Sequence, residues 1–131
     1  MTGLDTNLLL RYFLDDDPVQ SPKARRLMKS LSEVEPGWAS LAAILEFVWV
    51  LKSKNRAQRM TIAITLDRLL ALDTVVVEQA EVLAEAVRRF RFSKVDFADC
   101  LIAASARAAG CSKTVTFDHI AARDAGMELI A

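Results

Sequence analysis

The chain has 131 residues, of which 53% are apolar, and its 17 basic and 17 acidic side chains leave no net charge. This length fits one domain spanning residues 1–131 around a single core. No run of about 18 uncharged apolar residues exists to span a membrane, and Asp5 precedes any signal-like apolar segment, so the sequence predicts a cytoplasmic protein. Cys100 and Cys111 lie in a helical apolar pattern and are expected to be buried thiols.

Strands and helices are predicted to alternate along the whole chain. Strands follow from short apolar or β-branched runs, and helices from apolar residues at helical spacing. In chain order, the pattern predicts strand 2–5, helix 8–14, helix 22–31, strand 37–39, helix 41–52, helix 55–70, strand 74–77, helix 78–90, helix 96–109, strand 114–117, helix 119–124 and strand 127–130.

Several helix boundaries carry recognisable signals. Ser21 followed by Pro22 is typical of an N-cap with proline at the first helical position. Ser40 is expected to cap the long apolar helix that follows it, Asn55 to start the next helix, and Gly110 to close the helix before it. The helix after Asn55 is expected to turn one apolar face to the core, comprising Met60, Ile64, Leu66, Leu69 and Leu70.

This alternation indicates an α/β fold with a parallel sheet covered by helices on both faces. Ligands of such folds bind outside the carboxyl ends of the strands. Asp5 and Asp118 each follow a predicted strand and precede a helix, so both are expected at that edge. Thr116 lies two residues before Asp118, and its hydroxyl should share the same face. For Asp5 the alternative role is that of a helix N-cap.

Two further acidic positions are unusual. Glu46 lies in an almost wholly apolar helix, where a carboxylate needs a cation or a polar cleft unless it sits on an exposed stripe. Asp96 and Asp99 are three residues apart and lie on one side of a first helical turn. Asp96 suits an N-cap or a supporting role, so Asp99 is the better candidate for an acidic site.

Four segments together resemble the PIN-domain nucleases, in particular the VapC-type toxins of bacterial toxin-antitoxin pairs. The segments are GLDTN at residues 3–7, LAAILEFVWVL at 41–51, DFADCLIAA at 96–104 and TFD at 116–118. The resemblance implies a three-layer α/β/α sandwich with a central, mostly parallel sheet, and a ribonuclease that depends on Mg²⁺ or Mn²⁺. The family's catalytic and metal-binding acids carry over onto Asp5, Glu46, Asp99 and Asp118, with Asn7, Thr116 and Asp96 in supporting positions.

The number of acids agrees with this chemistry. Hard divalent cations take oxygen ligands, and several carboxylates crowded together repel one another unless a cation neutralises them. If a metal-activated hydroxide is the nucleophile, cleavage should leave 5′-phosphate and 3′-hydroxyl ends. A catalytically inactive PIN-fold module that only binds RNA or a protein is the alternative.

Partners are predicted from charge and from the resemblance. Four cations and two aromatic residues share the segment RRFRFSK at 88–94, which could hold RNA phosphates and stack a base. The alternative is a helix whose late arginines complement its dipole. The candidate RNA-binding residues are Arg88, Arg89, Arg91, Lys94 and, more weakly, Arg11. The resemblance also implies a homodimer and a cognate antitoxin, with candidate surfaces around Arg11, Tyr12, Phe13 and Trp49.

Overall fold

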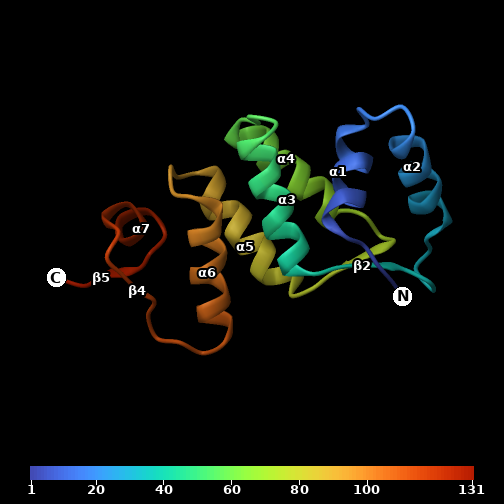
Figure 1. Ribbon diagram of the computed structural model, residues 1–131. Coiled ribbons are helices and arrows are strands. Elements are labelled where there is room, and N and C mark those ends of the chain that lie inside the picture. The colour runs from blue at the N-terminus through green and yellow to red at the C-terminus, as the bar shows by residue number, and fades with distance from the viewer. The chain divides into compact units, whose positions relative to one another are not determined.

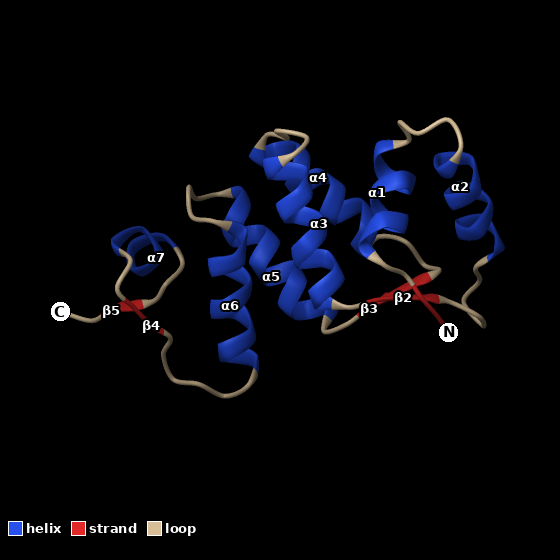
Figure 2. Ribbon diagram, viewed as in Figure 1, coloured by secondary structure: helices blue, strands red, loops and turns tan.

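The computed structural model describes residues 1–131 and divides into two compact units, Met1–Glu78 and Gln79–Ala131. Seven helices and five short strands alternate along the chain (Figures 1 and 2). Every strand pairing is parallel, which confirms the predicted α/β class. None of the helices combines the length and the apolar character needed to cross a membrane.

The first unit is built on a three-stranded parallel sheet in the order β1-β2-β3. Its strands are β1 (Thr2–Gly3), β2 (Gly37–Ala39) and β3 (Val75–Val77), and its helices are α1 (Thr6–Leu14), α2 (Gln20–Ser30), α3 (Leu41–Ser53) and α4 (Arg59–Leu70). The most deeply buried side chains of this unit come mainly from three of the helices, and they include Leu9, Ile44, Phe47, Ile62, Leu66 and Leu69.

Gly37 shows how closely the first unit packs around β2. A Cβ atom at this position would lie 2.8 Å from Cδ1 of Leu4 and 2.9 Å from Cδ1 of Leu31. Such contacts are too short for carbon atoms, so a larger residue would push both leucines away. The glycine therefore leaves room for the two buried leucines to close over the strand.

The second unit pairs two helices with a two-stranded parallel sheet. Helix α5 (Ala80–Arg91) packs on α6 (Phe97–Ala108), where Phe90 and Phe97 meet edge to face with centroids 5.6 Å apart. Strand β4 (Val115–Thr116), α7 (His119–Asp124) and β5 (Glu128–Leu129) complete the unit, and β4 pairs with β5.

The end of α6 confirms the predicted role of Gly110. Its φ of 96° is in the left-handed region, which glycine adopts without a steric penalty. The N–H of Gly110 donates to the carbonyl of Arg107, and the N–H of Cys111 donates to that of Ala106. This pair of bonds is the Schellman motif, and it satisfies the last carbonyl groups of the helix. Cys111 lies beyond this end and is exposed, which corrects the expectation of a buried thiol, whereas Cys100 is buried as predicted.

Two helix starts differ from the prediction. Helix α2 begins at Gln20, because the Asp17 carboxylate accepts the N–H groups of Val19 and Gln20 at 2.9 and 2.7 Å, while Ser21 is buried inside the helix. Helix α4 begins at Arg59 and not at Asn55. The N–H groups of residues 55 and 57 bond to the last carbonyl groups of α3, so this segment closes α3 and does not start α4.

Three other expectations are corrected. Strand β1 is shorter than predicted and exposed, although Leu4 behind it is buried. Helix α4 buries Ile62 and Ala63 with its leucines, whereas Met60 and Ile64 are exposed. Helix α5 starts after residue 79, whose φ of 50° is left-handed and incompatible with a helix interior.

Candidate functional site

A hollow of about 680 Å³ lies at the carboxyl ends of β1 and β2 in the first unit. We refer to this hollow as the acidic pocket. It is lined by residues 3–7, Trp38, Ser40 and the first two turns of α3. Asp5 and Glu46 both line it. Ligands of α/β folds bind at this edge of the sheet, so two of the four predicted acids lie where the fold offers a site.

Asp5 occupies the N-cap of α1. Its Oδ1 accepts the N–H of Leu8 at 2.9 Å, and its backbone is extended, as an N-cap requires. The capping alternative is therefore correct, but it does not remove Asp5 from the site. One carboxylate oxygen remains after the cap is made, and the exposed side chain lines the acidic pocket. The cap fixes the direction of the carboxylate.

Thr6 connects the two acids of the acidic pocket. Its side chain is buried, and its hydroxyl donates to the carbonyl of Ala43 in α3 at 3.0 Å. Ala43 precedes Glu46 by less than one helical turn, so this bond sets the position of Asp5 relative to Glu46. No pattern in the sequence predicts this role for Thr6. Asn7 is exposed and donates from Nδ2 to Oε1 of Gln20 at 3.3 Å.

Glu46 lies on an exposed stripe of α3 that also includes Ala42 and Trp49. The Glu46 side chain is exposed, and it lines the acidic pocket together with Ala42, so its exposure is compatible with a place in the site. Two groups fix the start of α3: Ser40 Oγ accepts the N–H of Ala43 at 3.0 Å, and Glu78 Oε1 accepts that of Leu41 at 2.8 Å. Glu78, predicted as the first residue of a helix, in fact caps the helix that carries Glu46.

The second unit brings Asp96, Asp99 and Asp118 near one another. Asp99 is half-buried in the first turn of α6, and Asp96 occupies the N-cap position without a side-chain capping bond. Burial raises the pKa of Asp99 above its ordinary value, and the negative charges of Asp96 and Asp118 raise it further. Burial and the two neighbouring negative charges therefore disfavour the ionised form of Asp99.

Asp118 is held at the end of β4 in the same way as Asp5 at the end of β1. It is the N-cap of α7, and its Oδ1 accepts the N–H of Ala121 at 2.9 Å. The Thr116 hydroxyl accepts the N–H of Asp118 at 3.0 Å and so fixes the turn between the strand and the helix. Both residues thus take part in one strand-to-helix junction.

The four acids have no basic partner. Asp5, Glu46, Asp99 and Asp118 form no ion pair with lysine or arginine. Neither unit by itself gathers three or more acidic, histidine or cysteine side chains that could hold a metal ion. Each unit therefore contributes carboxylates whose charge no cation of the chain neutralises.

The basic segment, residues 88–94, contains arginines with different roles. Arg89 donates from Nη1 to the carbonyl of Asp124 at 3.1 Å, and its guanidinium lies 3.3 Å from where a Cβ on Gly126 would stand. Arg89 thus supports the turn after α7. Arg88, by contrast, is exposed at a hollow of about 460 Å³, where the exposed ring of Phe92 also lies. This pairing of a cation and an aromatic ring suits a nucleotide.

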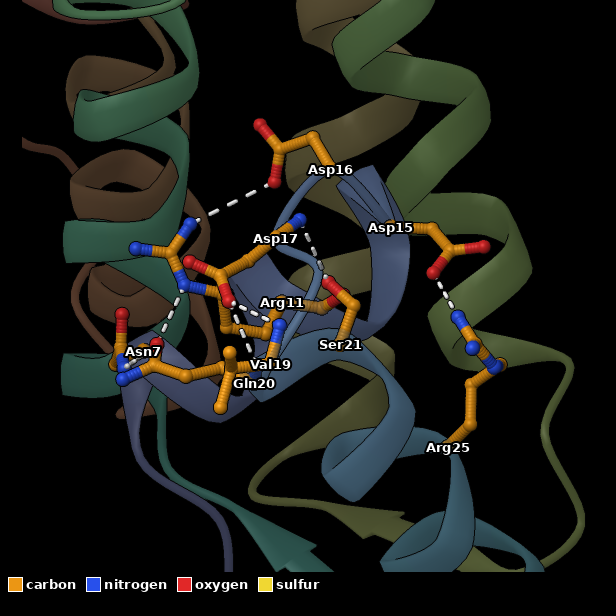
Figure 3. A network of polar contacts seen from close by, with 9 residues as sticks. All are labelled: Asn7, Arg11, Asp15, Asp16, Asp17, Val19, Gln20, Ser21 and Arg25. Atoms are coloured by element: carbon orange, nitrogen blue, oxygen red, sulfur yellow. Dashed lines mark hydrogen bonds and ion pairs between the residues drawn. The ribbon is translucent and has the colours of Figure 1, made fainter.

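Arg11 belongs to a polar network around the turn between α1 and α2 (Figure 3). Its Nε donates to Oε1 of Gln20 at 2.8 Å, and Nη1 lies 3.5 Å from Asp16. The buried Ser21 hydroxyl closes the turn, since it donates to the Arg11 carbonyl at 2.8 Å and accepts the N–H of Asp17 at 3.1 Å. Arg11 is therefore held in place and half-buried.

In each unit a short parallel strand leads to an aspartate that caps the next helix and has no basic partner, Asp5 in the first unit and Asp118 in the second. These features define an α/β protein with acidic strand ends. The PIN domain family matches residues 4–126, and the chain belongs to this family. This match covers both compact units. PIN domains are generally nucleases, which hydrolyse phosphodiester bonds of nucleic acids. No curated protein and no solved structure matches the chain.

Proposed function

We propose that this protein is a metal-dependent endoribonuclease of the VapC type, which acts in the cytoplasm and is inhibited by a cognate antitoxin. Asp5, Glu46, Asp99 and Asp118 are its catalytic and metal-binding residues. The observation that carries the proposal is that none of these acids has a basic partner, although Asp5, Asp99 and Asp118 lie at helix starts and Glu46 lies in the second turn of α3. Carboxylates kept unpaired in this way suit a cation that the chain itself does not supply.

The donor set fits Mg²⁺ or Mn²⁺. All four side chains offer oxygen atoms, which hard divalent cations prefer, and none of the four is a histidine or a cysteine. Asp99 supports this choice most directly, because burial and two neighbouring carboxylates raise its pKa. A divalent cation there would reverse that effect. When bound, the ion supplies Lewis-acid polarisation of a phosphate and an activated water.

The supporting residues keep the carboxylates in place. The Leu8 and Ala121 N–H groups orient Asp5 and Asp118. Thr6 holds α1 against α3 at the acidic pocket, and Thr116 fixes the turn at Asp118. Pre-organisation of this kind lets the acids meet a ligand without first rearranging.

RNA binding is assigned to cations of residues 88–94. The exposed Arg88 and Lys94 and the half-buried Arg91 would contact phosphates, and Phe92 offers a ring for base stacking. Arg89 acts through the turn that it supports.

A homodimer and a bound antitoxin complete the proposal. Trp49 on α3 is 58% exposed, which makes this helix face the first place to test for either partner. Phe13 is less accessible, because its ring packs at 5.8 Å from Phe47 and at 5.0 Å from Tyr12.

The test is cleavage of single-stranded RNA by the full chain with Mg²⁺ or Mn²⁺, and with EDTA instead. We expect metal-dependent cleavage that leaves 5′-phosphate and 3′-hydroxyl ends. Asp99→Asn and Glu46→Gln should each lower the rate by more than about 100-fold, which exceeds what loss of an outer-shell partner typically costs. Asp73→Asn, an exposed change of the same kind, is the matched control and should cleave normally.

The competing function is a PIN-fold module that binds RNA or protein without cleaving it. RNA binding without cleavage under any metal condition would establish that function and refute the nuclease. Products with cyclic phosphate ends would refute the metal-activated water, because they require attack by the RNA 2′-hydroxyl.

A further inference from the structure

A second hollow lies in the first unit, between α1 and α2, with a volume of about 300 Å³. We refer to it as the α1–α2 groove. Its apolar lining comes from the buried Ala24 and from the half-buried Leu8 and Leu27. Two cations also line it, Arg11 from α1 and Lys23 from α2. The groove thus combines an apolar surface with positive charge from two different helices.

The α1–α2 groove adjoins the acidic pocket. Asp5 and Asn7, at the start of α1, line both hollows. A ligand that extends out of the acidic pocket past Asn7 therefore enters the groove. The charge changes sign along this path, from the carboxylates of the pocket to the cations of the groove.

The two cations of the groove differ in how they are held. Arg11 is fixed by Gln20 and lies near Asp16, as Figure 3 shows, so its charge is partly balanced. Lys23 is exposed and has no carboxylate partner. It can therefore turn its ammonium group toward an anion without breaking an ion pair. Such an uncompensated lysine next to a site for phosphodiester chemistry suits a phosphate.

We propose that the α1–α2 groove binds a backbone phosphate of single-stranded RNA next to the phosphate in the acidic pocket. Lys23 is the principal contact and Arg11 the second, while the apolar lining packs against the ribose or base. This inference rests on the proposed function. An RNA strand fits better than an acidic peptide, because its phosphates repeat along a chain that can occupy the acidic pocket and the groove together.

The experiment measures binding of a fluorescently labelled single-stranded RNA to the full chain in EDTA, where cleavage is blocked, over a range of salt concentrations. Lys23→Gln is compared with Lys29→Gln, which removes the same charge from an exposed position of the same helix. We expect Lys23→Gln to weaken binding by about three- to tenfold and to reduce the slope of log K against log salt by about 0.7, as loss of one phosphate contact predicts. Lys29→Gln should change binding by less than about twofold.

Equal effects of the two substitutions would overturn the proposal, since binding would then depend on net charge alone. Polyglutamate that binds more tightly than RNA, and only when Lys23 is present, would also overturn it and make the groove a peptide site. Unchanged unfolding temperatures for both variants establish that folding is not the cause. The nuclease proposal is tested separately. A chain that binds RNA through Lys23 but never cleaves it would support the groove proposal and refute the nuclease proposal.

Discussion

The two compact units give their acids different surroundings, although Asp5 and Asp118 are both held as helix N-caps. In the first unit, Asp5 and Glu46 are exposed on the wall of an open pocket, and a buried threonine joins the helices that carry them. In the second unit, Asp99 is half-buried and faces the charges of Asp96 and Asp118. Asp5 and Glu46 are therefore positioned by tertiary contacts and exposed to water, whereas Asp99 is crowded by like charges.

This difference separates two requirements of an acidic site. The first unit supplies position, because capping bonds and Thr6 fix where the carboxylates point. The second unit supplies unsatisfied charge, because the Asp99 carboxylate gains from any cation that reaches it. Neither unit alone gathers enough ligands for a metal ion. The proposed function therefore requires acids of both units to take part in metal binding.

The strongest test of that requirement is the effect of Mn²⁺ on thermal unfolding. We expect Mn²⁺ at about 100 times its Kd to add about 2.7 kcal/mol to the free energy of unfolding, with a matching rise in Tm. Asp5→Asn and Asp99→Asn should each abolish most of this rise, although they lie in different units. Differential scanning calorimetry with and without the ion measures it.

Asp73→Asn is the control and should keep the full rise. If only one of the two site variants loses it, the ion belongs to one unit, and the four acids do not share it. Retention of the rise in both variants would remove these acids from the metal site altogether.

The sequence predicted the local features of the site better than its long-range contacts. Strand ends and capping residues are encoded in short segments, so Ser40 and Asp118 were placed correctly directly before their helices. For Asp5 the N-cap was the alternative role, and α1 begins at Thr6, two residues earlier than predicted. The bonds from Thr6 to Ala43 and from Leu41 to Glu78 each join residues 37 positions apart. No local pattern specifies such a pair, so both roles were missed.

Errors in the fold arose where two local signals competed. Ser21 before Pro22 favoured one helix start, but the Asp17 carboxylate capped the backbone earlier, and Ser21 instead bonds to the carbonyl of Arg11. Helix α4 is apolar on more than one side, so periodicity could not decide between the face with Ile62 and the face with Ile64. Packing against α3, which the sequence does not display, makes that choice.

A smaller effect is expected from Thr6→Val, which tests how the first unit sets its two acids. Valine keeps the shape of the buried side chain but removes the donor to the Ala43 carbonyl. We expect a loss of about 0.5 to 1.5 kcal/mol in the free energy of unfolding, the usual net value of one hydrogen bond. Urea denaturation measures this loss.

If Thr6 positions the site, Thr6→Val should lower the free energy of Mn²⁺ binding by more than it lowers the free energy of unfolding. The Mn²⁺ affinity should fall in this variant, whereas Thr6→Ser, which keeps the hydroxyl, should retain it. Equal Mn²⁺ affinity in Thr6→Val and the wild type would mean that Thr6 contributes only to the core and does not position the site.

The smallest expected effect concerns the second unit, where the charge of Asp99 opposes folding. Because burial and the nearby Asp96 and Asp118 raise the pKa of Asp99 above 3.8, the folded chain binds a proton more tightly there than the unfolded chain does. Stability contributed by this group therefore falls as pH rises from about 3.8 through the raised pKa, and the loss persists at neutral pH. In EDTA, Asp99→Asn should have a slightly higher Tm than the wild type at pH 7, and the difference should vanish below pH 3.8. A difference that stays constant across this range would mean that the side-chain amide itself stabilises the fold, and the like-charge account of the second unit would be wrong.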